Sequence, residues 1–379
     1  MVQDPTTSEH SRMPESAIAT GLADYVLPVE QMPEALIKYI QNYVNGAKTG
    51  AEETETPDHL DQILALLRTR TKLDFRSYRK RMLIRRIERR MSLSHFKSIA
   101  DYLAFLRDHP NEVKQVARDL LISVTHFFRD PDAFQALEED VIAPLVGAKK
   151  SDTSIRVWSA GCATGEEPYS LGMLLLEYLA SAQKNCQVQI FATDVDEDAL
   201  EVARHGMYPD SIAADVSSER LGQFFTRMDD AAYQVNKQLR EIVIFARQNL
   251  IADAPFSKLD LIVCRNLLIY LEPEVQKKVI ALLHFSLNEG GFLFLGPSET
   301  IGRHNDLFEP VSKNWRIFQR IGSSRPGRVE IPIVTAVDPL VPVRRLTAPS
   351  AIRPVSFAES THRLLLDQFA PAAVLISRK

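Results

Sequence analysis

The sequence is poor in cysteine and has no long apolar run. Three cysteines occur in 379 residues, and no two of them have the C-x-x-C spacing: Cys162, Cys186 and Cys264. Such a sparse, odd-numbered set argues against a disulfide framework and a zinc site, and it suits a reducing compartment. No apolar run is long enough to span a membrane, and the polar N-terminus lacks a signal-peptide core. We therefore expect a cytoplasmic protein without a metal site or membrane insertion.

The chain also lacks a strong net charge. It has 45 Lys and Arg against 49 Asp and Glu, a formal charge of −4. This balance provides no overall attraction to nucleic acid or to an anionic membrane, so an electrostatic partner must be recognised locally. The length and the 45% hydrophobic content are sufficient for two or three domains.

The hydrophobic pattern changes several times along the chain. Residues 58–150 show helical i, i+3, i+4 spacing and predict a small all-α domain. Residues 151–322 predict an α/β domain with a mostly parallel sheet, in which 206–240 interrupt the alternation as a small inserted β subdomain. The flanks are a short unit at 1–45, a polar linker at 46–57, a proline-rich linker at 323–357 and an unfinished segment at 358–379.

Strands and helices alternate regularly in the α/β region. Strands are expected at 155–158, 188–194, 241–249, 259–265, 291–296 and 315–320, and helices at 166–182, 197–205 and 273–288. The first strand-to-helix turn of such a sheet is where a ligand is held. The cofactor should therefore be sought between 158 and 166.

This turn is rich in small residues but has no phosphate-binding motif. Gly161 and Gly165 permit close approach to the backbone, whereas neither G-x-x-x-x-G-K-[ST] nor G-x-G-x-x-G occurs there. Glu166 and Glu167 follow, and they would repel a phosphate. A cationic cofactor such as S-adenosylmethionine (SAM) fits better, because either carboxylate can accept hydrogen bonds from its ammonium group. The alternative is simple complementation of the helix dipole.

Two later strand ends add polar groups. Asp194 ends the second strand, where an acidic residue binds the ribose hydroxyls of a nucleoside. Asn249 follows the third strand and could recognise an adenine edge. Together with the glycine turn, these residues favour an adenosyl cofactor without phosphate.

The motifs in this order resemble those of the CheR-type chemoreceptor methyltransferases. They are SVTHFFRDPDAF, WSAGCATGEEPYSLGMLL, FATDVDEDALEVAR, ARQNL and VCRNLLIYL. The resemblance implies a Rossmann-like SAM-dependent methyltransferase domain behind the all-α domain. It also implies that the cofactor lies against Thr125, Arg129, Gly161, Glu166, Asp194, Asn249, Leu250, Arg265 and Asn266.

The implied reaction is methyl esterification of glutamate side chains on the cytoplasmic helices of chemoreceptors. A glutamate is already ionised at neutral pH, so no general base is needed. The resemblance places Arg129 and Tyr270 beside the transferred methyl group, whereas a helix-end salt bridge and a core aromatic are their alternative roles. Two other functions stay open: a catalytically silent signalling adaptor of the same fold, and a methyltransferase for nucleic acid or a small molecule.

Residues 70–90 form a strongly basic helical segment that carries few acidic residues. Leu83, Ile87 and Met91 form an apolar stripe that can dock, and we expect four arginines to point outward and bind the substrate: Arg81, Arg85, Arg86 and Arg89. Glutamate-rich receptor helices fit this charge. RNA, DNA or a merely solvated face are the alternatives, and the scarcity of interleaved aromatics argues against nucleic acid.

The flanks carry two weaker resemblances. Residues 1–45 resemble the C-terminal end of a CheB-type methylesterase, with Asp4 at the place of its triad aspartate but without the matching serine and histidine, so no esterase activity is expected. Residues 358–379 resemble the start of a PAS domain. Some CheR-type proteins bind a receptor C-terminal pentapeptide through a glycine-rich loop. No glycine occurs between Gly222 and Gly290, so we expect that tether to be absent.

Overall fold

The computed structural model describes residues 1–8, 12–19, 23, 25–37, 56–121, 123–228, 232–302, 304 and 306–322. The chain divides into two units, Met1–Val334 and Thr335–Lys379. The expected segments 323–357 and 358–379, and all but the last two residues of the linker 46–57, lie outside the described residues. Among the helices that the structure describes, none combines the length and apolar character required to cross a membrane.

The N-terminal residues form a small parallel ladder. Strand β1 (Val2–Gln3) pairs with β2 (Val26–Leu27), and short helices accompany them, among them η1 (Pro5–Thr7), α1 (Arg12–Ala19) and η2 (Val29–Gln31). Asp4 caps η1, since its carboxylate accepts a hydrogen bond from the Thr6 N–H at 2.9 Å.

An all-α domain follows, as its hydrophobic periodicity predicts. It contains α3 (Thr56–Thr71), α4 (Lys80–Leu93), α5 (Ile99–Asp108) and α6 (Pro110–Leu120). The apolar stripe of α4, Leu83, Ile87 and Met91, is buried among side chains of the other three helices. Pro110 begins α6, where its missing N–H costs no helical hydrogen bond.

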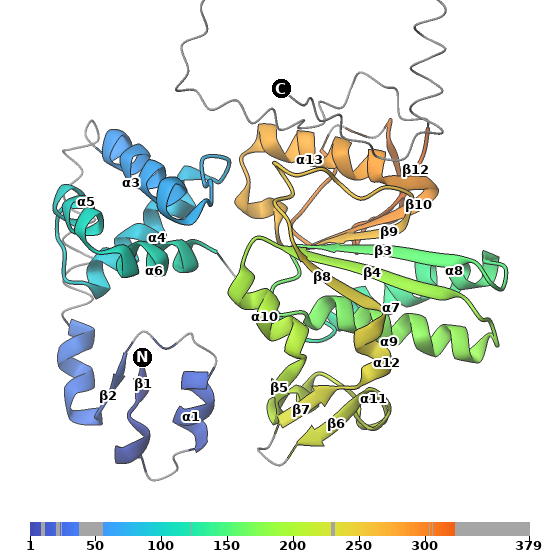
Figure 1. Ribbon diagram of the computed structural model, residues 1–379, viewed down its shortest axis with the longest axis horizontal. Coiled ribbons are helices and arrows are strands. Elements are labelled where there is room, and N and C mark those ends of the chain that lie inside the picture. Colours follow the sequence, from blue (N-terminus) through green and yellow to red (C-terminus); the bar gives the residue numbers. More distant parts are fainter. Residues whose placement is uncertain are drawn as a thin grey trace, which may run out of the picture. The chain divides into compact units, whose positions relative to one another are not determined.

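The α/β region is built on a mixed seven-stranded sheet (Figure 1). The strand order is β11-β12-β10-β9-β3-β4-β8, with bounds β3 (Ser154–Ala160), β4 (Gln187–Asp194), β8 (Val243–Arg247), β9 (Leu259–Cys264), β10 (Leu287–Leu295), β11 (Phe308–Ser312) and β12 (Ile317–Arg320). The five strands from β10 to β8 run parallel, whereas β12 is antiparallel to β10 and to β11. The expected strands are confirmed, and β11 is an additional edge strand.

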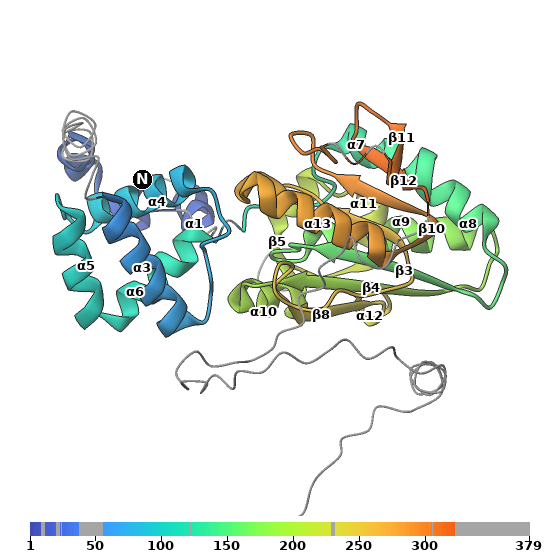
Figure 2. The same cartoon turned by 90° about the horizontal axis from the view of Figure 1, so that it is seen from above.

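Helices cover both faces of this sheet, so most residues of its central strands β3 and β9 are buried. Helix α13 (Pro273–Ser286) lies across one face, and α7 (Pro131–Leu137), α8 (Ala143–Ala148) and α9 (Glu166–Ser181) cover the other (Figures 1 and 2). Each face of the sheet has its own hydrophobic core. Successive side chains of β3 point to opposite faces, so Val157 packs in one core and Trp158 in the other. The π-helix η3 (Glu138–Ile142) joins α7 to α8.

The inserted β subdomain is confirmed between α10 (Glu197–His205) and β8. Its antiparallel sheet has the order β5-β7-β6, formed by β5 (Met207–Pro209), β6 (Phe225–Met228) and β7 (Ala232–Val235). Three short helices surround it: η4 (Asp210–Ala214), α11 (Ser218–Phe224) and α12 (Lys237–Glu241).

The hydrophobic contacts suggest a domain boundary different from the expected residue 150. Phe127, Phe134, Val141 and Val146 pack in the core of the seven-stranded sheet, whereas the core of the all-α domain ends at Leu120 and Leu121. We propose that the all-α domain ends near residue 121 and that the next helices belong to the sheet domain.

Candidate functional site

The candidate site lies where the parallel strands end. Strand β3 has β4 on one side and β9 on the other, so the chain connections on the two sides of β3 run in opposite directions. In parallel sheets such a point opens a crevice at the carboxyl ends of the strands. Residues 161–165 connect β3 to α9 there. Gly165 has φ of +96°, and a Cβ on it would lie 2.8 Å from the Cβ of Ala203. Only glycine therefore fits this turn, which brings α9 to the crevice.

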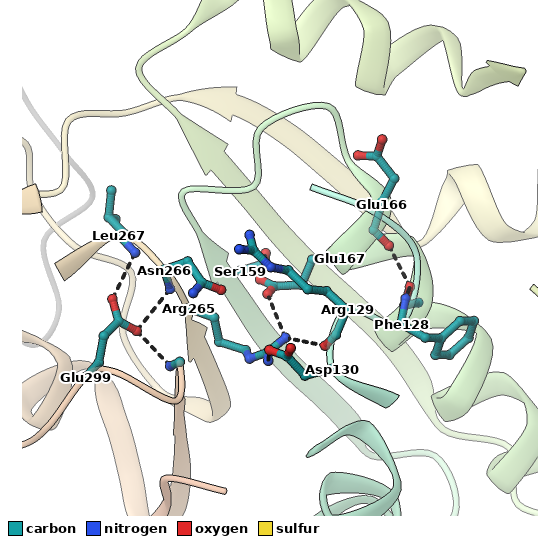
Figure 3. Close-up of polar contacts among 12 residues, drawn as sticks. Phe128, Arg129, Asp130, Ser159, Glu166, Glu167, Arg265, Asn266, Leu267 and Glu299 are labelled. Carbon is teal, nitrogen blue, oxygen red and sulfur yellow. Dashed lines mark hydrogen bonds and ion pairs between the residues drawn. The ribbon is translucent and has the colours of Figure 1, made fainter. Parts of the chain in front are cut away.

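The adjacent carboxylates Glu166 and Glu167 face different sides of the first turn of α9. Glu167 accepts a hydrogen bond from Ser159 Oγ at 2.8 Å, and its other oxygen lies 3.9 Å from Arg265 Nη1. Glu166 accepts from Thr164 Oγ1 at 2.7 Å, and its side chain points away from the group around Arg129 (Figure 3). Burial raises the pKa of both carboxyls.

Asp194 lies at the end of β4, as expected for a ribose-binding carboxylate. It accepts hydrogen bonds from the N–H groups of Ala163 and Asp196, both at 2.9 Å. Burial raises its pKa, and no lysine or arginine of the described residues forms an ion pair with it. The neighbouring residue Gln248 is bonded to Asp194 through the backbone, since its N–H donates to the Asp194 carbonyl at 2.9 Å. The side-chain Oε1 atom of Gln248 is buried without a hydrogen-bond partner.

Asn249 and Leu250 occupy the turn that follows β8. The Oδ1 atom of Asn249 accepts from the Ile251 N–H at 2.9 Å, which leaves the amide nitrogen of Asn249 to recognise a ligand. Leu250 is buried and packs against the sheet core. Sequence reasoning named Asn249 here but missed Gln248, which lies in the same quoted motif.

Arg265 is almost completely enclosed by protein. Its side chain is 1% exposed, and it donates to the carbonyl of Arg129 at 2.9 Å and to Asp130 at 2.6 Å (Figure 3). Its guanidinium carbon also lies 4.6 Å from the centroid of the Phe294 ring. Its Nε atom is buried without a hydrogen-bond partner. The side chain therefore positions Arg129 and Asp130, and the cofactor contact that the resemblance implies stays a prediction.

Asn266 is held in a left-handed conformation, with φ of +58°, at the end of β9. The cause is Glu299, a buried carboxylate that sequence reasoning missed. Its oxygens accept from four backbone N–H groups, those of Asn266, Leu267, Leu268 and Gly296, at 2.6–3.0 Å; Figure 3 shows the bonds to Asn266 and Leu267. The available signal was an acidic residue just after β10, the neighbour of β9. The Oδ1 atom of Asn266 remains buried without a partner.

Arg129 and Tyr270 come from separate segments. Arg129 precedes α7, four residues after Thr125, and its Nη1 donates to the Val124 carbonyl at 3.0 Å. Its guanidinium lies near Glu167 and Ser159 (Figure 3). Asp130 pairs with Arg265, and among the ion pairs of the described residues Arg129 forms none with Asp130 or Asp132. Tyr270 ends η5 (Leu268–Tyr270), and its carbonyl accepts from the Arg79 N–H at 2.8 Å.

The basic face of α4 is smaller than expected. Arg81, Arg85 and Arg89 are exposed, but Arg86 is half-buried and donates to the carbonyl of Asp119. The expectation that Arg86 points outward is therefore wrong. The reason is helical geometry, since position 86 lies about 60° from the buried position 83 around the helix axis.

The acceptor atoms of the crevice suit a cofactor with many donors and a positive charge. Asp194 has no ion-pair partner among the described residues, and Gln248 and Asn266 hold acceptor oxygens that are buried without a hydrogen-bond partner. SAM has ribose hydroxyls, an adenine amino group and a cationic head, so the residues present fit it. Within the described ranges, no group of three or more His, Cys, Asp or Glu residues could hold a metal ion.

This fold and crevice define a SAM-dependent methyltransferase, and comparisons with known proteins specify which one. The family model described as "CheR methyltransferase, SAM binding domain" matches residues 123–317, and "CheR methyltransferase, all-alpha domain" matches 58–121. The chain belongs to the CheR methyltransferase family, and its cofactor is SAM. A CheB methylesterase model also matches residues 1–36.

Two relatives illustrate the extent of the similarity. The chain is 31% identical over 244 residues to chemotaxis protein methyltransferase 2 of Vibrio cholerae, covering 63% of this chain and 84% of that protein. It is 35% identical over 401 residues to an uncharacterized 104.1 kDa protein of Rhodobacter capsulatus, covering 99% of this chain and 41% of that protein. The chain thus spans less than half the length of the second relative.

Proposed function

We propose that the chain transfers the methyl group of SAM to glutamate side chains on cytoplasmic helices of methyl-accepting chemoreceptors. The observation that carries the proposal is the guanidinium of Arg129, which lies in the crevice beside Glu167 and does not pair with the neighbouring Asp130 (Figure 3). A cation so placed can bind one oxygen of a substrate carboxylate. Relatives named chemotaxis protein methyltransferase support this choice of substrate.

Each site residue has a defined task in this reaction. SAM supplies an activated methyl group on a cationic sulfur. Asp194 binds the ribose hydroxyls, and Asn249 and Asn266 provide further polar contacts. Arg129 orients the substrate carboxylate, with Tyr270 as a second donor beside it. The nucleophile is ionised at neutral pH, so alignment is the main contribution of the protein.

Substrate binding is assigned to the exposed arginines of α4, Arg81, Arg85 and Arg89. Attraction between this face and a glutamate-rich helix accelerates encounter and weakens as salt is added. The proposal includes no pentapeptide tether and places the chain in the cytoplasm, where these receptor helices lie.

A labelled-methyl assay on receptor-containing membranes tests the proposal. We expect label on the receptors that mild base releases as methanol, which is the behaviour of an ester. Arg129→Ala should lower turnover about a hundredfold, as loss of one preorganised charge donor does, with a smaller effect on SAM affinity. If the protein binds SAM but no receptor is labelled, the catalytically silent signalling adaptor is favoured instead. A base-stable label on nucleic acid would favour a nucleic-acid methyltransferase.

A further inference from the structure

The segment that carries Arg129 is strained. Phe128 and Asp130, on either side of Arg129, have φ of +49° and +61°. Side-chain-bearing residues rarely adopt such angles, and they persist where surrounding contacts enforce them, often at functional sites. The geometry of Arg129 is therefore set by whatever holds its two neighbours.

Two anchors hold the backbone of this segment. The Phe128 N–H donates to Ser170 Oγ of α9 at 3.0 Å (Figure 3). On the other side, Arg265 binds the carbonyl of Arg129 and the carboxylate of Asp130. Both anchors come from the main sheet and its helix.

A third anchor comes from the inserted subdomain. The guanidinium carbon of Arg220, on α11, lies 4.5 Å from the centroid of the Phe128 ring. Its Nε and Nη2 donate to the two carboxylate oxygens of Glu177 of α9 at 2.9 and 2.8 Å. This two-point bond fixes the plane of the guanidinium, which stacks as a cation on the aromatic ring. The ring in turn packs edge-on against Phe134, with the centroids 5.5 Å apart.

We propose that Arg220 is a positioning residue for Arg129, through which the inserted subdomain adjusts methyl transfer. Arg220 acts by fixing the Phe128 ring and hence the strained turn that aims Arg129. The inference rests on the proposed function of Arg129.

The test compares Arg220→Lys and Arg220→Ala with the control Arg204→Ala. Arg204 also pairs with a glutamate, Glu197, at 2.6 Å, but on α10 and away from Phe128. We expect both Arg220 variants to lower kcat about tenfold, because small misplacements of a catalytic group are costly, with the Kd of SAM unchanged within about twofold. Lysine retains the charge but not the planar stack, so it should not restore turnover.

A double-mutant cycle separates positioning from general destabilisation. In an Arg129→Ala background, Arg220→Lys should have no further effect on kcat, since the residue through which it acts is absent. A full additional loss in that background would overturn the proposal. So would an Arg220→Lys enzyme with the kcat of the wild type.

Hydrogen–deuterium exchange provides a readout that needs no substrate. Amides of residues 124–130 should exchange faster in Arg220→Lys than in the wild type and in Arg204→Ala. Unchanged exchange there would refute the anchoring role even if the receptor assay failed. Faster exchange combined with an inactive wild type would instead contradict only the proposed function.

Discussion

Glu112 in the all-α domain and Asp194 in the crevice are both poorly exposed carboxylates, but their surroundings differ. Glu112 accepts from Arg90 Nε at 2.7 Å and Nη2 at 3.0 Å, and from the Tyr102 hydroxyl at 2.9 Å. The hydrogen bonds from Arg90 are the main cause that lowers the pKa of Glu112. Asp194 receives only backbone N–H groups, and its burial raises its pKa.

The contrast separates a carboxylate that stabilises the fold from one kept for a ligand. A paired charge contributes to folding, whereas a buried charge without a cation is a cost that binding can offset. Glu166 resembles Asp194 in this respect, because burial raises its pKa and no described arginine or lysine pairs with it. An unpaired acidic pocket is what a cationic cofactor requires.

Of the variants that test this comparison, Asp194→Asn should have the largest effect, which is on cofactor binding. The variant loses charged acceptors for the ribose hydroxyls, so the Kd of S-adenosylhomocysteine should rise about 30-fold, or about 2 kcal/mol. Thermal stability should fall only modestly, since the single amide oxygen can still accept from one of the two N–H groups, Ala163 or Asp196. Calorimetry measures the affinity, with the exposed Asp210→Asn as control. Equal affinity in the two variants would contradict the assigned role.

Breaking the pair in the other region should affect stability instead. Arg90→Ala leaves Glu112 and Tyr102 without their cation, and the free energy of unfolding of the all-α domain should fall by about 2 kcal/mol. Urea unfolding followed by circular dichroism measures this change. Arg81→Ala, on the exposed face of the same helix, is the control and should change little. Cofactor affinity that fell together with stability would show that the two regions are not independent.

Acidification should separate the two carboxylate types. The cationic cofactor prefers ionised Asp194 and Glu166, so affinity should fall as the pH drops through their raised pKa values, which lie above the ordinary 3.8 and 4.5. The pKa of Glu112 is lowered instead, so the contribution of this carboxylate to folding stability depends on pH in a different range. It is fully present above the ordinary 4.5 and is lost only as the pH falls through the lowered folded pKa.

Calorimetry and unfolding along one pH series measure the order of these events. Cofactor affinity should weaken first, and the all-α domain should lose stability at lower pH. Simultaneous loss of both, or tighter binding in acid, would remove the distinction between the two carboxylates.

Much of the fold could be predicted because burial on both faces makes the central strands rich in apolar residues, as in LDLIVC of β9. Strand β11 was not predicted, because its residues, FEPVS, include a proline and exposed side chains, which are typical of an edge strand. The stripe of α4 was correctly predicted, but Arg86 was misplaced. Its charge alone suggested an outward position, whereas its place on the helix, about 60° from the buried Leu83 around the axis, predicts partial burial.

The site could be predicted only in outline. Strand ends indicated Asp194 and the glycine turn, because parallel strands end at one edge. The partners of Arg265 could not be found locally, since Asp130 lies 135 residues away in the sequence. The different directions of Glu166 and Glu167 also depend on tertiary contacts. Neighbours on a helix point about 100° apart, and Thr164 and Ser159 then fix each one.

The smallest expected effect concerns the surface of the all-α domain. Arg85→Glu should raise the KM for receptor about threefold, because an exposed charge contributes under about 1 kcal/mol and mainly affects encounter. Added salt should reduce the difference, and Lys237→Glu on α12 is a control of equal charge change. Arg86→Ala should instead lower stability, since its guanidinium binds the Asp119 carbonyl inside the domain. Initial methylation rates at two salt concentrations measure the first effect, and a KM unchanged by Arg85→Glu at low salt would remove α4 from the substrate surface.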